Sequence, residues 1–117
     1  MASFRLTETG NVMTIQQGAT FSLSVNYSAV ANLSSGYTAR MQGRTTHDAS
    51  ATVFSLTSSD GITLGSSSPN IVVTIAATAT DDFDAPSSGV YDLELVQGSN
   101  VYRILEGSFE ITPEVTR

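Results

Sequence analysis

The chain has 117 residues, with five basic and eleven acidic residues, a formal net charge of −6 and no cysteine. This length predicts a single domain over residues 1–117, and the absence of cysteine excludes disulfides, thiolate metal sites and a cysteine nucleophile. The negative charge argues against binding to nucleic acid or to an anionic membrane, and no apolar run is long enough to cross a bilayer. Because the first residues lack the pattern of a signal peptide, we expect the protein to stay in the cytoplasm where it is made, or to leave it by lysis.

Apolar and polar residues alternate along most of the chain, which predicts half-buried strands with one solvated face. In Phe21–Tyr27, for example, the odd-numbered residues are apolar and those between them are Ser or Asn. Turn residues such as Gln17-Gly18 and Asp60-Gly61 separate the alternating segments. The strands predicted in the first two thirds of the chain are 12–15, 20–27, 37–42, 53–56, 62–64 and 71–75.

The segment Ala76–Phe83 interrupts the alternation, and its alanines favour a single helical turn that crosses between sheets. The alternation then resumes in 91–96 and in 101–105, and it continues on one face through Ile111. Gly98-Ser99-Asn100 between these two segments predicts a tight hairpin, because Gly and Asn accept positive φ at little cost.

Seven or eight short strands in one small chain predict an all-β protein, an Ig-like two-sheet β-sandwich of antiparallel strands. Gly89-Val90-Tyr91 is similar to the tyrosine corner of Ig-like folds, in which the Tyr hydroxyl bonds to an upstream loop. The sequence lacks the paired cysteines and the tryptophan of antibody domains. A jelly roll or a small barrel is the alternative architecture.

Two groups of residues raise the question of catalysis or metal binding. His47 precedes Asp48 and could act as a general base, but no nucleophile motif accompanies it, so we expect a solvated loop histidine. Asp81, Asp82 and Asp84 could offer oxygen ligands to calcium, but the EF-hand spacing is missing and a solvated turn is the simpler interpretation.

Asp92 and Glu94 stand two residues apart on one strand face, a spacing compatible with a pair of glycosidase carboxylates. No aromatic residues flank them in a way that would form a sugar platform, so we expect an ordinary solvated face. We therefore predict no catalytic residue, no metal site and no cofactor.

Three arginines are the main candidates for a functional surface. Arg40 and Arg44 share a face of one predicted strand, and Arg103 lies on another. They could pair across strands with Asp92 or Glu94, which is the favoured interpretation, or they could anchor a partner protein. The loop 65–70 and the C-terminal segment 112–117 are further candidates. The predicted interface residues are Arg40, Arg44, Arg103, Pro113, Glu114 and Arg117.

Four segments carry a resemblance to a known family. They are Val90–Leu95, Val101–Arg117, Gly36–Gln42 and Ile15–Phe21. In their order along the chain they resemble a family of small virion structural proteins of tailed bacteriophages and prophages. They are also similar to the N-terminal Ig-like modules that fix fibres to phage tails in baseplate and receptor-binding proteins. The resemblance implies a structural role in a particle, and it carries over no catalytic residue.

The resemblance implies a tail or baseplate adaptor, assembled in the bacterial cytoplasm, that joins a fibre or spike to the tail hub. A capsid decoration protein bound to the major capsid protein is the first alternative, and a carbohydrate-binding module is the second. We expect a homo-oligomer in the particle, since repetition around a symmetric structure lets weak contacts add up.

Overall fold

The computed structural model describes residues 12–116. Within them lie eight strands and one short helix, α1 (Ala77–Thr80), between the sixth and seventh strands. Most strands have three to seven residues. In chain order they are β1 (Met13–Gln16), β2 (Phe21–Val25), β3 (Thr38–Arg44), β4 (Phe54–Thr57), β5 (Ile62–Leu64), β6 (Ile71–Ile75), β7 (Ser87–Gln97) and β8 (Asn100–Thr112).

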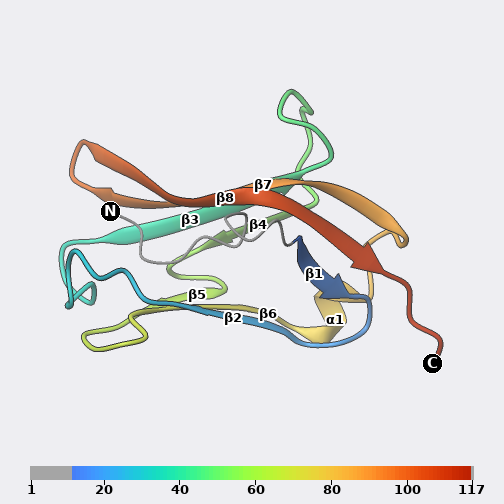
Figure 1. Ribbon diagram of the computed structural model, residues 1–117, viewed down its shortest axis with the longest axis horizontal. Helices are drawn as coiled ribbons and strands as arrows, with labels where there is room; N and C mark the ends of the chain where they lie inside the picture. Colours follow the sequence, from blue (N-terminus) through green and yellow to red (C-terminus); the bar gives the residue numbers. More distant parts are fainter. Residues whose placement is uncertain (1–11, 117) are drawn as a thin grey trace.

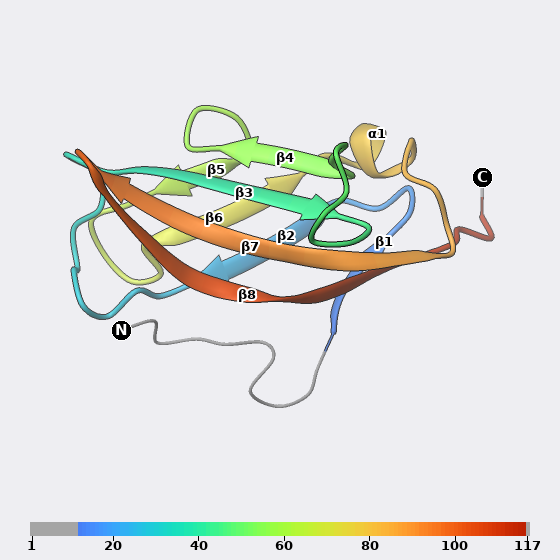
Figure 2. The ribbon, with the colours of Figure 1, turned by 90° about the horizontal axis from the view of Figure 1, so that it is seen from above.

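The strands form two sheets that face each other as two layers (Figure 1, Figure 2). The five-stranded sheet has the order β1-β8-β7-β3-β4, and the three-stranded sheet has the order β2-β6-β5. The helix α1 connects β6 of the smaller sheet to β7 of the larger one. The predictions of an all-β sandwich-like protein and of a helical turn crossing between sheets are therefore confirmed.

Two details of the predicted sandwich are wrong. The strands are not all antiparallel, because β1 runs parallel to β8, with Met13 opposite Phe109. They are also not all short, since β7 has 11 residues and β8 has 13. The alternation of side chains reports which face of a strand is buried, but it carries no information about the direction of the neighbouring strand.

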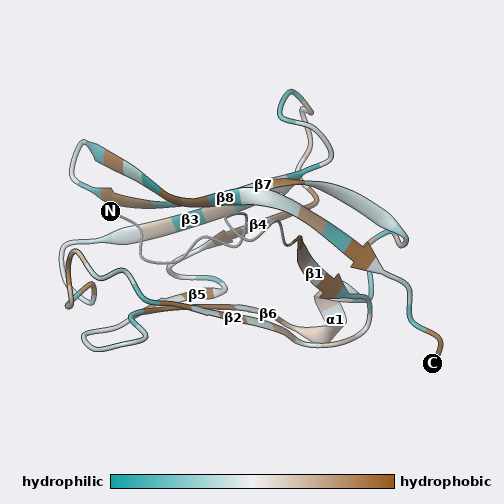
Figure 3. Ribbon diagram, in the orientation of Figure 1, coloured by the Kyte–Doolittle hydropathy of each residue, from teal (hydrophilic) through white to brown (hydrophobic). Residues whose placement is uncertain are grey.

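The core lies between the two sheets, and it contains the residues that the alternation assigns to the inner faces. Leu93 and Leu95 of β7 and Phe109 of β8 are completely buried. The Phe54 ring meets the Phe109 ring edge-on, at 5.3 Å between centroids, a favourable aromatic geometry. Figure 3 shows the apolar and polar residues alternating along β8.

Tyr91 lies on the inner face, but it forms no tyrosine corner. Its hydroxyl is buried and has no hydrogen-bond partner in the described part of the chain. Tyr91 stands opposite Gly43 of β3 and Gly107 of β8, in the middle of the sheet. Its side chain points into the apolar core between the sheets, where the described residues offer the hydroxyl no partner. This prediction is wrong.

One buried polar residue was not expected. Asn70 ends the loop 65–70, a predicted candidate for contact with partners, yet its side chain is almost completely buried. Its Oδ1 accepts a hydrogen bond from the amide of Tyr27 at 2.8 Å, and its Nδ2 donates to the carbonyls of Tyr27, Val30 and Ala31. Asn70 therefore fixes the segment after β2 against β6, so this end of the loop is structural.

Candidate functional site

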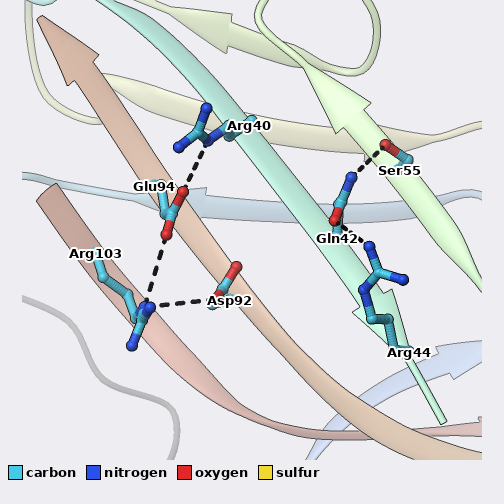
Figure 4. Close-up of polar contacts among 7 residues, drawn as sticks. All are labelled: Arg40, Gln42, Arg44, Ser55, Asp92, Glu94 and Arg103. Carbon is cyan, nitrogen blue, oxygen red and sulfur yellow. Dashed lines mark hydrogen bonds and ion pairs between the residues drawn. The ribbon is translucent and has the colours of Figure 1, made fainter. Parts of the chain in front are cut away.

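The outer face of the five-stranded sheet carries a cluster of charged side chains, which we call the charged face. Its members come from the adjacent strands β3, β7 and β8, where alternation points them away from the core. Figure 4 shows several of them side by side. The charged face consists of Arg40, Arg44, Asp92, Glu94, Arg103 and Glu106, and it holds every arginine of residues 12–116.

Cross-strand ion pairs connect the three strands. Glu94 stands opposite Arg40 on one side and opposite Arg103 on the other. Arg40 Nε donates to Glu94 Oε1 at 2.7 Å, and Arg103 Nε lies 3.4 Å from Asp92 Oδ2 and 3.8 Å from Glu94 Oε2. The prediction of pairing within the domain is confirmed for Arg40 and Arg103.

Arg44 has different partners. Its Nη1 donates to the carbonyl of Ala49 and its Nη2 to Oε1 of Gln42, both at 2.9 Å. The guanidinium group therefore holds the middle of the loop between β3 and β4 against the sheet. Arg44 shares the outer face with Arg40, as predicted. Neither of these two hydrogen bonds is made to a carboxylate.

The surroundings of Asp92 oppose the charged form of its carboxyl group. Partial burial raises its pKa, the nearby charge of Glu94 raises it further, and Arg103 only partly opposes the two effects. Its ion pair with Arg103 is also longer than the bond between Arg40 and Glu94. An ionised carboxylate offers about four acceptor sites, so Asp92 can accept further hydrogen bonds beside its contact with Arg103.

A hollow of about 450 Å³ opens beside this cluster. Hydrogen-bond donors and acceptors both line it, since it is bordered by two arginines, two carboxylates, an amide and an imidazole. These side chains belong to Gln42, Arg44, His47, Asp92, Arg103 and Glu106. His47 is exposed on the loop between β3 and β4, as expected for a solvated histidine, and it also borders the hollow.

A bulge in β8 explains why the sequence did not reveal the full cluster. Arg103 and Glu106 are three residues apart, a spacing that puts two residues on opposite faces of a regular strand. The register shifts between Leu93 and Glu94 of β7, so that Leu93 faces Leu105 and Glu94 faces Arg103. The extra residue, Ile104, brings Glu106 to the outer face, where its Oε1 lies 3.7 Å from Arg103 Nη1.

The C-terminal segment lies apart from the charged face. Arg103 is near the first residue of β8 and Pro113 follows its last, so the length of the strand separates them. Pro113 is exposed, whereas Glu114 is half-buried and its amide donates to Oε1 of Gln17 at 3.1 Å. Arg117 lies outside the described residues. The predicted interface residues therefore form two separate groups.

The other predicted candidates do not come together. Across residues 12–116, no three His, Asp or Glu side chains are grouped so that they could hold a metal ion, and this includes the exposed Asp81, Asp82 and Asp84. Asp92 and Glu94 both lie within ion-pair distance of Arg103.

In residues 12–116, no helix has the length and apolar character needed to span a membrane.

Comparison with known proteins gives no assignment. No protein-family model matches the chain, and no curated protein matches it significantly.

Proposed function

We propose that this protein is a non-enzymatic structural protein of a bacteriophage particle, an adaptor that fixes fibres or spikes to the tail or baseplate. The resemblance of the segments 90–95 and 101–117 to phage virion proteins supports this role, and so does the two-sheet architecture, which we propose to be of the Ig-like kind. Such adaptors need surfaces for neighbouring proteins and no reaction centre.

The observation that carries the proposal is the hairpin formed by β7 and β8. Its two-residue turn, Gly98-Ser99, lies at the end that rises away from the three-stranded sheet in Figure 1. Val101 and Tyr102 near this tip are 48% and 40% exposed, an unusual position for two large apolar neighbours. Exposed apolar side chains on a projecting element are typical of contact surfaces.

The edge of β8 adds a second means of contact. Within residues 12–116, β1 pairs only with Phe109–Thr112, so the stretch 100–108 has no strand on the side opposite β7. Unpaired backbone groups on such an edge can accept a strand from another protein. We propose that the hairpin and this edge bind the neighbouring virion protein.

The first test is the copy number of the protein in purified particles, measured by quantitative mass spectrometry against the major capsid protein. An adaptor should be present in a small number that matches the symmetry of the tail. A number comparable to that of the capsid protein would instead support capsid decoration, and absence from the particle would contradict both structural roles.

A paired set of variants tests the hairpin. Val101→Ser combined with Tyr102→Ser should reduce incorporation into particles while the isolated protein keeps its thermal unfolding midpoint, because both side chains are already exposed. Val12→Ser is the matched control, since Val12 is 43% exposed but lies at the other end of β8, next to β1. Equal incorporation of both variants would remove the hairpin from the proposal.

A further inference from the structure

We propose that the hollow on the charged face binds a neutral sugar residue. Its volume of about 450 Å³ lies within the range of small-ligand sites in proteins, about 300–1,000 Å³. The proposal concerns a ligand of the isolated domain, so it is independent of the proposed place in a tail.

The polar groups around the hollow match the chemistry of hydroxyl groups. Ionised Asp92 and Glu106 only accept hydrogen bonds, Arg44 and Arg103 only donate them, and the amide of Gln42 does both. A sugar hydroxyl can donate to a carboxylate and accept from a guanidinium at the same time. A ring bearing several hydroxyls can therefore use both kinds of group.

Charge decides between a neutral and an ionic ligand. A cationic ligand would meet Arg44 and Arg103, and an anionic ligand would meet Asp92 and Glu106, so each would face repulsion from one side of the hollow. The charges of the wall already compensate one another, as the contacts of Arg103 with Asp92 and Glu106 show. A neutral polyhydroxyl ligand gains hydrogen bonds to these charged groups without such repulsion.

The hollow also offers a small apolar surface. Val90 is half-buried and lines it, and the flat imidazole of His47 borders it from the loop. Gly107 contributes no side chain, so the backbone of β8 forms that part of the wall. These groups can contact the C–H face of a sugar ring, a role that no tryptophan can fill in this chain.

The test is a titration of ¹⁵N-labelled protein, followed by the backbone amide signals in NMR spectra. The probes are glucose, galactose, mannose, rhamnose and N-acetylglucosamine, each taken to about 100 mM because single sugars with few contacts bind weakly. We expect at least one sugar to shift the amide signals of Asp92 and Gly107 in a saturable manner. The absence of saturable shifts with all five would overturn the proposal.

Two variants and two charged probes make the result specific. Asp92→Asn should raise the dissociation constant of the bound sugar about tenfold, since it removes a charge-assisted acceptor. Glu110→Gln removes the same charge from the same face of the sheet, but on β8 and outside the hollow, and it should leave the dissociation constant within about twofold. If the dissociation constant of the sugar rises equally in both variants, the hollow is not the binding site. Tighter binding of acetate or of acetyl-arginine amide than of any sugar would also contradict the proposal.

Discussion

At the scale of single residues, Tyr91 shows how a buried polar atom can oppose stability. Its hydroxyl lies in the core without a hydrogen-bond partner among the described residues. A buried hydroxyl without a partner loses its bonds to water and gains none, so it costs free energy. Tyr91→Phe should therefore raise the free energy of unfolding by about 1 kcal/mol, measured by urea denaturation. A true tyrosine corner would give the opposite result, a loss of stability.

The same residue predicts sensitivity to alkali. Burial raises the pKa of Tyr91 from 10.0 to about 12. Because the folded protein holds this proton more tightly than the unfolded chain, the contribution of Tyr91 to stability is constant below about pH 10 and falls as the pH rises toward 12. Unfolding midpoints of the natural protein should therefore drop over this interval, and those of Tyr91→Phe should drop less.

Asp92 predicts a second pH dependence, at the acidic end. Its pKa lies above the value of 3.8 for a free aspartate, so the folded state binds this proton more tightly than the unfolded state. The associated stability is present below about pH 3.8 and is lost as the pH rises through the raised pKa. Asp92→Asn should remove this decline in denaturation curves recorded from pH 3 to pH 7. A steeper decline in the variant would show that Asp92 is stabilised as a carboxylate.

At the scale of elements, Gly89 sets the approach of β7 to its two neighbours. A side chain at this position would overlap the carbonyl oxygen of Arg44 in β3 and would lie 2.8–2.9 Å from the ring of Phe109 in β8. Because one obstacle is backbone and the other is a fully buried ring, neither can move easily. Gly89→Ala should lower the free energy of unfolding by about 2 kcal/mol or more.

Gly65→Ala is the matched control for this prediction. The nearest atoms to an added side chain there are 3.9 Å away, and Gly65 does not have positive φ. The thermal unfolding midpoint of the Gly65→Ala variant should stay within about 2 °C of that of the natural protein. If the two variants lose the same stability, close packing at Gly89 is not the reason.

The elements also show what a sequence can predict. The alternation in Tyr91, Leu93 and Leu95 depends only on which face is buried, so the strand and its inner face follow from it. The bulge at Ile104 and the parallel pairing of β1 with β8 depend on contacts between distant segments, which local patterns do not encode. For this reason the three arginines and the solvated face of Glu106 could be predicted, whereas the joining of Glu106 and Arg103 on one face, and the hollow beside them, could not.

At the scale of the whole molecule, charge is distributed unevenly. The three strands of the smaller sheet contain no charged residue, and the charged face holds all arginines of residues 12–116. Three arginines stand against ten acidic residues in this part of the chain. Three of these acidic residues, Asp81, Asp82 and Asp84, lie close together in the connection after α1. The protein therefore combines local ion pairs with an overall negative field.

These two features predict opposite responses to salt, so the response shows which one dominates. Salt weakens the exposed ion pairs of Arg40 and Arg103, but each such pair contributes at most about 1 kcal/mol. Salt also screens the mutual repulsion of the acidic residues, which extends over the whole surface. We expect the repulsion to dominate, so the urea midpoint should rise when sodium chloride is increased from about 0.05 M to about 0.5 M, a range over which the Debye length shrinks several-fold.

Asp82→Asn combined with Asp84→Asn should raise the urea midpoint at low salt and reduce the effect of salt, because both side chains are exposed and add to the repulsion. A midpoint that falls with salt would mean that the charged face contributes more to stability than the negative surplus removes.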